Sequence, residues 1–115
     1  RSLSDLFRRL GIRSVYFAED DTGLNAYPIV LGDLDRQWKA HVAPDCLQSY
    51  GEVDGLIHRK GADGWDYTFH QIEVGADGQP VLVLLRGDEG RLERWPLDAA
   101  YALFGLDVAT TVPEN

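Results

Sequence analysis

The sequence predicts an α+β fold: an N-terminal helix, several short strands, a four-stranded antiparallel β-meander at about 55–96, and a C-terminal helix packed on the sheet. Three observations support this prediction. Between residues 55 and 96, runs rich in Val, Ile, Leu and aromatic residues are separated by GADG at 61–64, GADG at 75–78 and GDEG at 87–90. Gly and Asp supply the positive φ angles and local hydrogen bonds that tight reversals need. Apolar residues at helical spacing precede and follow this region.

The N-terminal helix is expected to begin after Ser2, with Asp5 three residues further on in a near match to a capping box. Its apolar face follows the i, i+3, i+4, i+7 spacing, at Leu3, Leu6, Phe7 and Leu10. Gly11 is suited to end it. A helix this short is marginal alone, so we expect it to dock on the sheet.

Extended segments are expected between this helix and the meander. We predict three short strands there, at 12–18, 27–31 and 37–42. Pro28 donates no backbone hydrogen bond, which limits the second strand to a sheet edge or a strand start. A short turn of helix is expected at 46–50, with Asp45 as its N-cap and Gly51 after its end.

The hairpins suggest a register if each glycine-rich segment is a four-residue loop. The expected cross-strand pairs are then Lys60–Trp65, Arg59–Asp66, His58–Tyr67, Phe69–Leu84, Ile72–Val81, Leu85–Leu92 and Leu82–Trp95. Because side chains alternate along a strand, one face would carry Ile57, His70, Ile72, Val81, Val83, Leu85 and Leu92. The other face would carry Leu56, Tyr67, Phe69, Leu82, Leu84 and Trp95. The run 81–85 is apolar on both faces, which predicts a strand covered on both sides.

The last helix is expected to begin at Trp95–Asp98, where Pro96 suits a first helical turn and Asp98 favours the positive end of the helix dipole. Its broad apolar side consists of Leu97, Ala100, Tyr101, Leu103 and Phe104. Gly105 is suited to end this helix. Residues 108–115 are expected to be a loose tail, and 1–115 a single domain.

Composition limits the function classes. Nineteen acidic against eleven basic residues give a net charge of −8, which disfavours nucleic-acid binding and favours a basic partner or plain solubility. No apolar run approaches the roughly 20 residues that span a bilayer, and no signal peptide is evident. The single cysteine, Cys46, favours a reducing compartment, the cytoplasm. The absence of Met, including at position 1, indicates a trimmed or processed chain and leaves open whether an upstream segment is missing.

Catalytic and metal-binding motifs are not evident in the sequence. Structural zinc sites need four N or S ligands at compact spacing, whereas His41, Cys46, His58 and His70 are spread singly. Cys46 near a helix N-terminus, with His41 as a base, is a weaker alternative; a buried apolar cysteine is the simpler interpretation. We therefore expect no catalytic residue, no metal and no cofactor.

A mixed polar and aromatic rim on the meander is the most suggestive functional feature. Its expected contact residues are Lys60, Trp65, Tyr67, Arg91 and Trp95, with Glu93 on the same side as the last two. Trp, Tyr and Arg are enriched at binding hot spots. We expect a non-catalytic, acidic protein-binding module: an adaptor, a chaperone-like protein or an inhibitor or immunity-type protein. The simpler interpretation is that the two tryptophans only close the ends of the core. Trp65 is expected to be the more exposed of the two.

The competing function class is a small-molecule-binding or small enzymatic domain. Its pocket would lie between a helix and the sheet, near His58, Tyr67 and His70. The sequence favours a protein partner, without nucleic acid or membrane, and is compatible with either a monomer or a homodimer.

Overall fold

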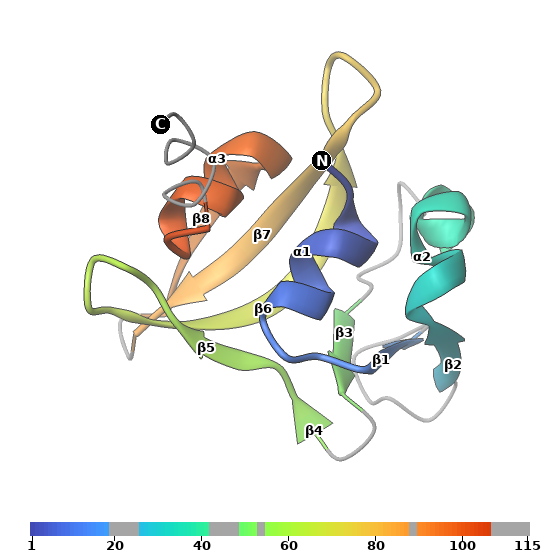
Figure 1. Cartoon of the computed structure of the whole chain (residues 1–115), viewed down its shortest axis with the longest axis horizontal. Coiled ribbons are helices and arrows are strands. Elements are labelled where there is room, and N and C mark those ends of the chain that lie inside the picture. The colour runs from blue at the N-terminus through green and yellow to red at the C-terminus, as the bar shows by residue number, and fades with distance from the viewer. Residues whose placement is uncertain (19–25, 42–48, 53–54, 88–89, 107–115) are drawn as a thin grey trace, which may run out of the picture.

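The described part of the chain forms two four-stranded antiparallel sheets and three α-helices (Figure 1), which confirms the predicted α+β class. The computed structural model describes residues 1–18, 26–41, 49–52, 55–87 and 90–106. Sheet A has the order β2-β1-β3-β4 and contains β1 (Ser14–Ala18), β2 (Ala26–Val30), β3 (Ser49–Glu52) and β4 (Gly55–Leu56). Sheet B is the expected meander and contains β5 (His58–Lys60), β6 (Asp66–Val74), β7 (Pro80–Arg86) and β8 (Arg91–Pro96).

The first helix, α1 (Leu3–Arg9), begins as predicted: the Ser2 side chain accepts a hydrogen bond from the Asp5 N–H over 3.0 Å. Leu3, Leu6 and Phe7 are fully buried. Gly11 follows the helix with a φ of +83°, a conformation that glycine adopts without steric cost. The predicted capping residue and apolar face are both confirmed.

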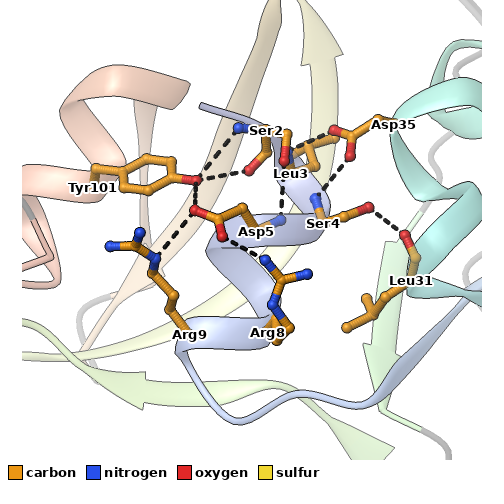
Figure 2. A network of polar contacts seen from close by, with 9 residues as sticks. All are labelled: Ser2, Leu3, Ser4, Asp5, Arg8, Arg9, Leu31, Asp35 and Tyr101. Atoms are coloured by element: carbon orange, nitrogen blue, oxygen red, sulfur yellow. Dashed lines mark hydrogen bonds and ion pairs between the residues drawn. The ribbon is translucent and has the colours of Figure 1, made fainter.

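Polar contacts connect α1 to both other helices (Figure 2). On one side, the Asp35 carboxylate accepts the N–H groups of Leu3 and Ser4, over 2.6 and 3.1 Å. On the other side, the Tyr101 hydroxyl lies 2.8 Å from Asp5 Oδ2 and 3.0 Å from the Ser2 carbonyl. The first N–H groups of a helix have no partner within it, so the Asp35 carboxylate completes the capping of α1 from a different helix.

The strand predicted at 37–42 is wrong. The chain forms α2 (Leu31–Gln37) and then a 3₁₀ turn, η1 (Trp38–His41). Leu31, Leu34 and Trp38 have the i, i+3, i+7 spacing of a helix, and all three contribute to the core. The alternation of apolar and polar residues from Trp38 onward hid this pattern.

The helical turn predicted to extend to Tyr50 is also wrong in the part that the structure describes. Tyr50 lies in β3, opposite Phe17 of β1. The Gly51 backbone lies so close to Gly55 that a Cβ atom on Gly51 would lie 2.4 Å from the Gly55 carbonyl oxygen. Asp45 and Cys46, which the prediction used as a cap and a first helical residue, lie outside the described residues.

The predicted register of the first hairpin is wrong by one residue. Arg59 lies opposite Tyr67, and Lys60 opposite Asp66, whereas the prediction paired Arg59 with Asp66. The cause is the loop length: the Gly61 N–H donates to the Trp65 carbonyl over 2.8 Å, so three residues stand between this closing pair. The Trp65 N–H bonds to the Asp63 side chain and not to the partner strand. A turn followed by a positive-φ glycine, here Gly64, is the common three-residue hairpin loop.

The second hairpin repeats this loop, and a β-bulge then restores the predicted register. Near the turn, Val81 faces Glu73, not Ile72 as predicted. A register shift between Phe69 and Gln71 leaves His70 as an extra residue in β6, and beyond it Phe69 faces Leu84, as predicted. The third hairpin is confirmed, with Leu82 opposite Trp95.

The bulge changes which side chains share a face. It places Ile72 on the buried face of sheet B with Tyr67, Phe69, Leu82 and Leu84. Ile57 is buried and Leu56 exposed, the reverse of the predicted assignment. The outer face carries Val81, Val83, Leu85 and Leu92; of these, Val83 is only 1 % exposed, yet it lies outside the main core cluster. Val81 and Leu85 on the outer face are half-buried, so this face of β7 is covered less completely than the inner face, where Leu82 and Leu84 are fully buried.

The last helix, α3 (Leu97–Leu103), packs on β7 and β8 as predicted (Figure 1). Gly105 follows it with a φ of +74°. Residues 108–115, the predicted tail, lie outside the described residues.

The core lies where the two sheets meet α1 and α3. Phe69 is at its centre: its ring contacts those of Phe7, Tyr50 and Phe104 at centroid distances of 5.5, 5.9 and 5.6 Å. Since these four rings come from β6, α1, β3 and the end of α3, one aromatic cluster joins most layers of the fold. Such ring pairs add about 0.5–1.5 kcal/mol each beyond the area they bury.

Candidate functional site

A corner of sheet B brings together most of the predicted rim residues. It is formed by the turn before β6, the end of β7 and the start of β8. We call this surface the Trp65 corner and define it as Trp65, Arg86, Arg91, Glu93 and Trp95. Trp65, Arg91 and Trp95 are predicted contact residues, and Glu93 lies on the predicted rim between the last two; Arg86 was missed.

Trp65 is a large aromatic side chain held in place although it is 40 % exposed. The Arg86 guanidinium lies over its ring, 4.3 Å from the ring centroid, which is within the range of a cation–π interaction. Gly87 lies beneath the ring edge, where a Cβ atom would be only 3.2 Å from a ring carbon. The ring therefore rests against a cation and a side-chain-free stretch of backbone.

Glu93 organises the remainder of the corner. Its carboxylate accepts hydrogen bonds from Arg91 Nη2 over 3.0 Å, from Trp95 Nε1 over 3.1 Å and from Arg86 Nη1 over 3.4 Å. The hydrogen bond from Arg91 is the largest cause that lowers the pKa of Glu93. Burial, the second-largest cause, acts to raise this pKa, and Trp95 and Arg86 lower it further, so the net shift is downward. Glu93 is therefore held as an anion that fixes three neighbouring side chains.

Tyr67 lies below this surface, not on it. Its ring is buried and contacts Trp95 edge-on at a centroid distance of 6.4 Å. Its hydroxyl donates to Asp63 Oδ2 over 2.7 Å. Burial, followed by the bond to Asp63, raises the pKa of Tyr67 to about 12. Tyr67 thus supports the turn that carries Trp65.

Lys60 is exposed and lies opposite Asp66 at the end of β5. In the corrected register it is no longer the cross-strand partner of Trp65. Trp65 is the more exposed tryptophan, as expected, since Trp95 is half-buried and packs against the core.

The residues of the alternative pocket do not come together between a helix and the sheet. His58 faces Thr68 on the outer face, with Nδ1 2.9 Å from Thr68 Oγ1. Tyr67 is buried on the opposite face. His70 is the half-buried bulge residue. A shallow depression of about 380 Å³ does contain His58, and Arg59, Lys60, Asp66, Thr68 and Gly87 also line it.

A sequence signal for the missed Arg86 exists in the third hairpin. Arg86 faces Arg91 across this hairpin, and Glu93 is two residues further along the same face. The two arginines and the carboxylate, which lies two pairs further along the strands, form a charge cluster on one face. The correctly predicted register already contains this cluster.

No described helix is long and apolar enough to cross a membrane. Within the described ranges, no three His, Cys, Asp or Glu side chains are grouped so that they could hold a metal ion. Comparisons of the chain with protein families, curated proteins and solved structures give no match.

Proposed function

We propose that this chain is a non-catalytic protein-binding module whose contact surface is the Trp65 corner. The observation that carries the proposal is the exposed Trp65 ring stacked on Arg86. Trp and Arg are the residues that most often dominate binding energy when they are buried at an interface. The net charge of −8 favours a basic partner by electrostatic steering.

Order in the unbound state supports this proposal. Binding costs about 0.5–1.5 kcal/mol for each side chain that becomes immobile. Trp65 is held by Arg86 through its ring and by Asp63 through its backbone N–H. Arg91 and Trp95 are held by Glu93. These side chains are therefore already ordered in the unbound protein, so binding a partner loses less conformational entropy.

The role that fits is an adaptor, a chaperone-like protein or an inhibitor or immunity-type protein. The single cysteine in the sequence supports a cytoplasmic location as part of the same proposal.

The experiment compares wild type, Trp65→Ala and Val74→Ala as immobilised baits in native lysate, followed by titration of the purified partner. Val74 is 48 % exposed at the far end of β6, so it controls for loss of exposed apolar surface. Trp65→Ala should weaken binding by about 30-fold to about 1000-fold, corresponding to about 2–4 kcal/mol. Melting temperatures of all three should stay close. Equal affinity of wild type and Trp65→Ala would contradict the proposal.

The second candidate is small-molecule binding in the depression at His58. The contact between His58 and Thr68 and the adjacent Arg59 and Lys60 supply hydrogen-bonding and charged groups on one surface. A thermal-shift screen against metabolites and nucleotides, repeated with His58→Ala, tests it. A ligand that stabilises wild type but not the variant would support this candidate, and the absence of any such ligand would count against it.

A further inference from the structure

We propose that a second copy of this chain pairs with the free edge of β8, so that two copies of sheet B form one continuous antiparallel sheet. Sheet B ends at β8, which pairs with β7 on one side only among the described residues. An unpaired edge presents N–H and C=O groups that can form hydrogen bonds with another strand. The proposed contact shares Arg91 and Glu93 of β8 with the Trp65 corner but does not involve Trp65 itself.

The direction of the free backbone groups follows from one hydrogen bond. The Gly87 N–H donates to the Asp66 carbonyl over 2.7 Å, so the backbone groups of Gly87 point toward β6. Because these groups alternate in direction along a strand, those of Arg86 point toward β8. Arg86 faces Arg91. The backbone groups of Leu92 and Arg94 therefore point away from the sheet, toward the free edge.

The side chains of β8 are complementary to themselves in one register. In this register Leu92 faces Leu92 of the second copy, and the two-fold axis passes between them. The N–H of each Leu92 can then donate to the C=O of the other. Arg91 then faces Glu93 of the second copy, and Glu93 faces the second copy's Arg91. Opposite charges directly across an antiparallel pair are stabilising. Arg94 faces Gly90, which presents no side chain.

Neighbouring registers are less favourable. An axis at Glu93 places two carboxylates opposite each other, and an axis at Arg94 places two guanidinium groups opposite each other. Like charges directly across a strand pair are destabilising. Charge therefore selects the Leu92 register among the three.

Apolar contact on the outer face supports the same register. Leu92 is 41 % exposed, and it faces the half-buried Leu85 of β7. Pairing at Leu92 creates a row of four leucines across the two copies: Leu85, Leu92 and the same two residues of the second copy. The part of β8 that can pair is short, because Pro96 at its end has no N–H to donate to a second strand. The interface is thus at the small end of specific interfaces, and the dimer should be weak and concentration-dependent.

The first test is sedimentation velocity of the full chain over a concentration series, with wild type, Leu92→Pro and Val74→Lys. Proline at position 92 removes an N–H that points away from β7, a position at which edge strands tolerate it. We expect wild type and Val74→Lys to dimerise alike and Leu92→Pro to dissociate at least about tenfold more readily. Circular dichroism melts check that each variant folds. A wild-type monomer at every concentration overturns the proposal, as does a folded Leu92→Pro that dimerises like wild type.

The second test measures the register by cross-linking in a Cys46→Ser background, which removes the single native cysteine. Cα atoms of a hydrogen-bonded antiparallel pair lie about 5.5 Å apart, within the range of about 4.4–6.8 Å that a disulfide spans. Leu92→Cys should therefore form disulfide-linked dimers under mild copper-catalysed air oxidation. Two Arg94→Cys copies would be offset by roughly 13 Å along the strands and should not. Cross-linking of Arg94→Cys but not Leu92→Cys would overturn the proposed register.

The two proposals can fail separately. Trp65→Ala should dimerise like wild type, since Trp65 is not on β8. Leu92→Pro should retain binding of any partner that contacts the Trp65 corner through Trp65 and Arg86. If Trp65→Ala abolished dimerisation while it remained folded, the edge of β8 would not be the dimer contact.

Discussion

The hydroxyl of Tyr101 donates a hydrogen bond to Asp5 Oδ2 over 2.8 Å, and this contact links the last helix to the first (Figure 2). The bond is the main cause that lowers the pKa of Asp5. We expect Tyr101→Phe to lower the melting temperature by about 3–6 °C, because a hydroxyl bond of this kind is lost while its partners stay in place. In an NMR titration of the variant, the pKa of Asp5 should rise toward its ordinary value. An unchanged Asp5 titration would contradict the assigned cause.

The matched control for Tyr101→Phe is Tyr50→Phe. The Tyr50 hydroxyl is buried, and the described residues supply no hydrogen-bond partner for it. A buried polar group without a partner is destabilising, so its removal should raise the free energy of unfolding by about 1 kcal/mol. Urea denaturation of both variants measures this. A loss of stability in Tyr50→Phe as large as that in Tyr101→Phe would show that Tyr50 has a polar partner.

Leu84 and Leu85 are adjacent in β7 but lie on opposite faces, which makes them a matched pair. Leu84 is 0 % exposed and belongs to the core cluster, whereas Leu85 is half-buried on the outer face. Leu84→Ala should cost about 2–5 kcal/mol, because it leaves a cavity in the core. Leu85→Ala should cost less than about 1.5 kcal/mol, because a half-buried side chain contributes less than a fully buried one and the outer face can relax. Equal losses in chemical denaturation would show that both faces of β7 are equally packed.

Deletion of His70 should be tolerated. The strand pairing passes from Phe69–Leu84 to Gln71–Val83, so His70 has no partner in β7. Removal of the residue would straighten β6 and keep every other side chain on its present face. Deletion of Thr68, which faces Leu85, would instead exchange the faces of part of β6. We expect a cooperative thermal transition for the His70 deletion and none for the Thr68 deletion; similar behaviour of the two would contradict the bulge assignment.

Alkaline pH should destabilise the protein through Tyr67. Its folded-state pKa of about 12 lies above the ordinary value of 10.0, because burial and the bond to Asp63 disfavour the phenolate. The unfolded chain therefore loses this proton first. The stability that Tyr67 contributes is fully present below pH 10 and is lost as pH rises toward about 12.

The measurement is denaturant titration of wild type and Tyr67→Phe at several pH values in this window. The difference in free energy of unfolding between the two should shrink as pH rises. Phenolate absorbance monitors ionisation directly. A difference that is constant with pH would mean that Tyr67 ionises normally in the folded state.

Turn chemistry explains what the sequence predicted and what it missed in the meander. The Gly and Asp residues correctly predicted the positions of all three reversals. Composition alone did not show that the side chains of Asp63 and Asp77 accept hydrogen bonds from the N–H groups of Trp65 and Gln79. Each of these hydrogen bonds shortens the hairpin loop from the predicted four residues to three, which shifts the strand register by one residue. Because both GADG loops close alike, one rule accounts for both shifts.

The errors elsewhere have a different origin. Trp38 fits a strand pattern with its C-terminal neighbours and a helical pattern with Leu31 and Leu34. The helix forms because it packs all three side chains against the core. Trp65 was correctly expected to be exposed because it follows a turn. Its stacking on Arg86 depends on residues 21 positions apart in the chain, which local pattern does not reveal.

The hydrogen bond between the Tyr101 hydroxyl and the Ser2 carbonyl also has a consequence for the rates of folding and unfolding. Tyr101 lies 99 residues from Ser2, so their contact closes nearly the whole chain into a loop. Long loops are entropically costly to close early, so this contact should form after the folding transition state. Tyr101→Phe would then leave the refolding rate almost unchanged and accelerate unfolding, the behaviour of a low φ-value position. The contact between the first and last helices would thus determine the unfolding rate, and therefore the lifetime of the native state, and not the folding rate.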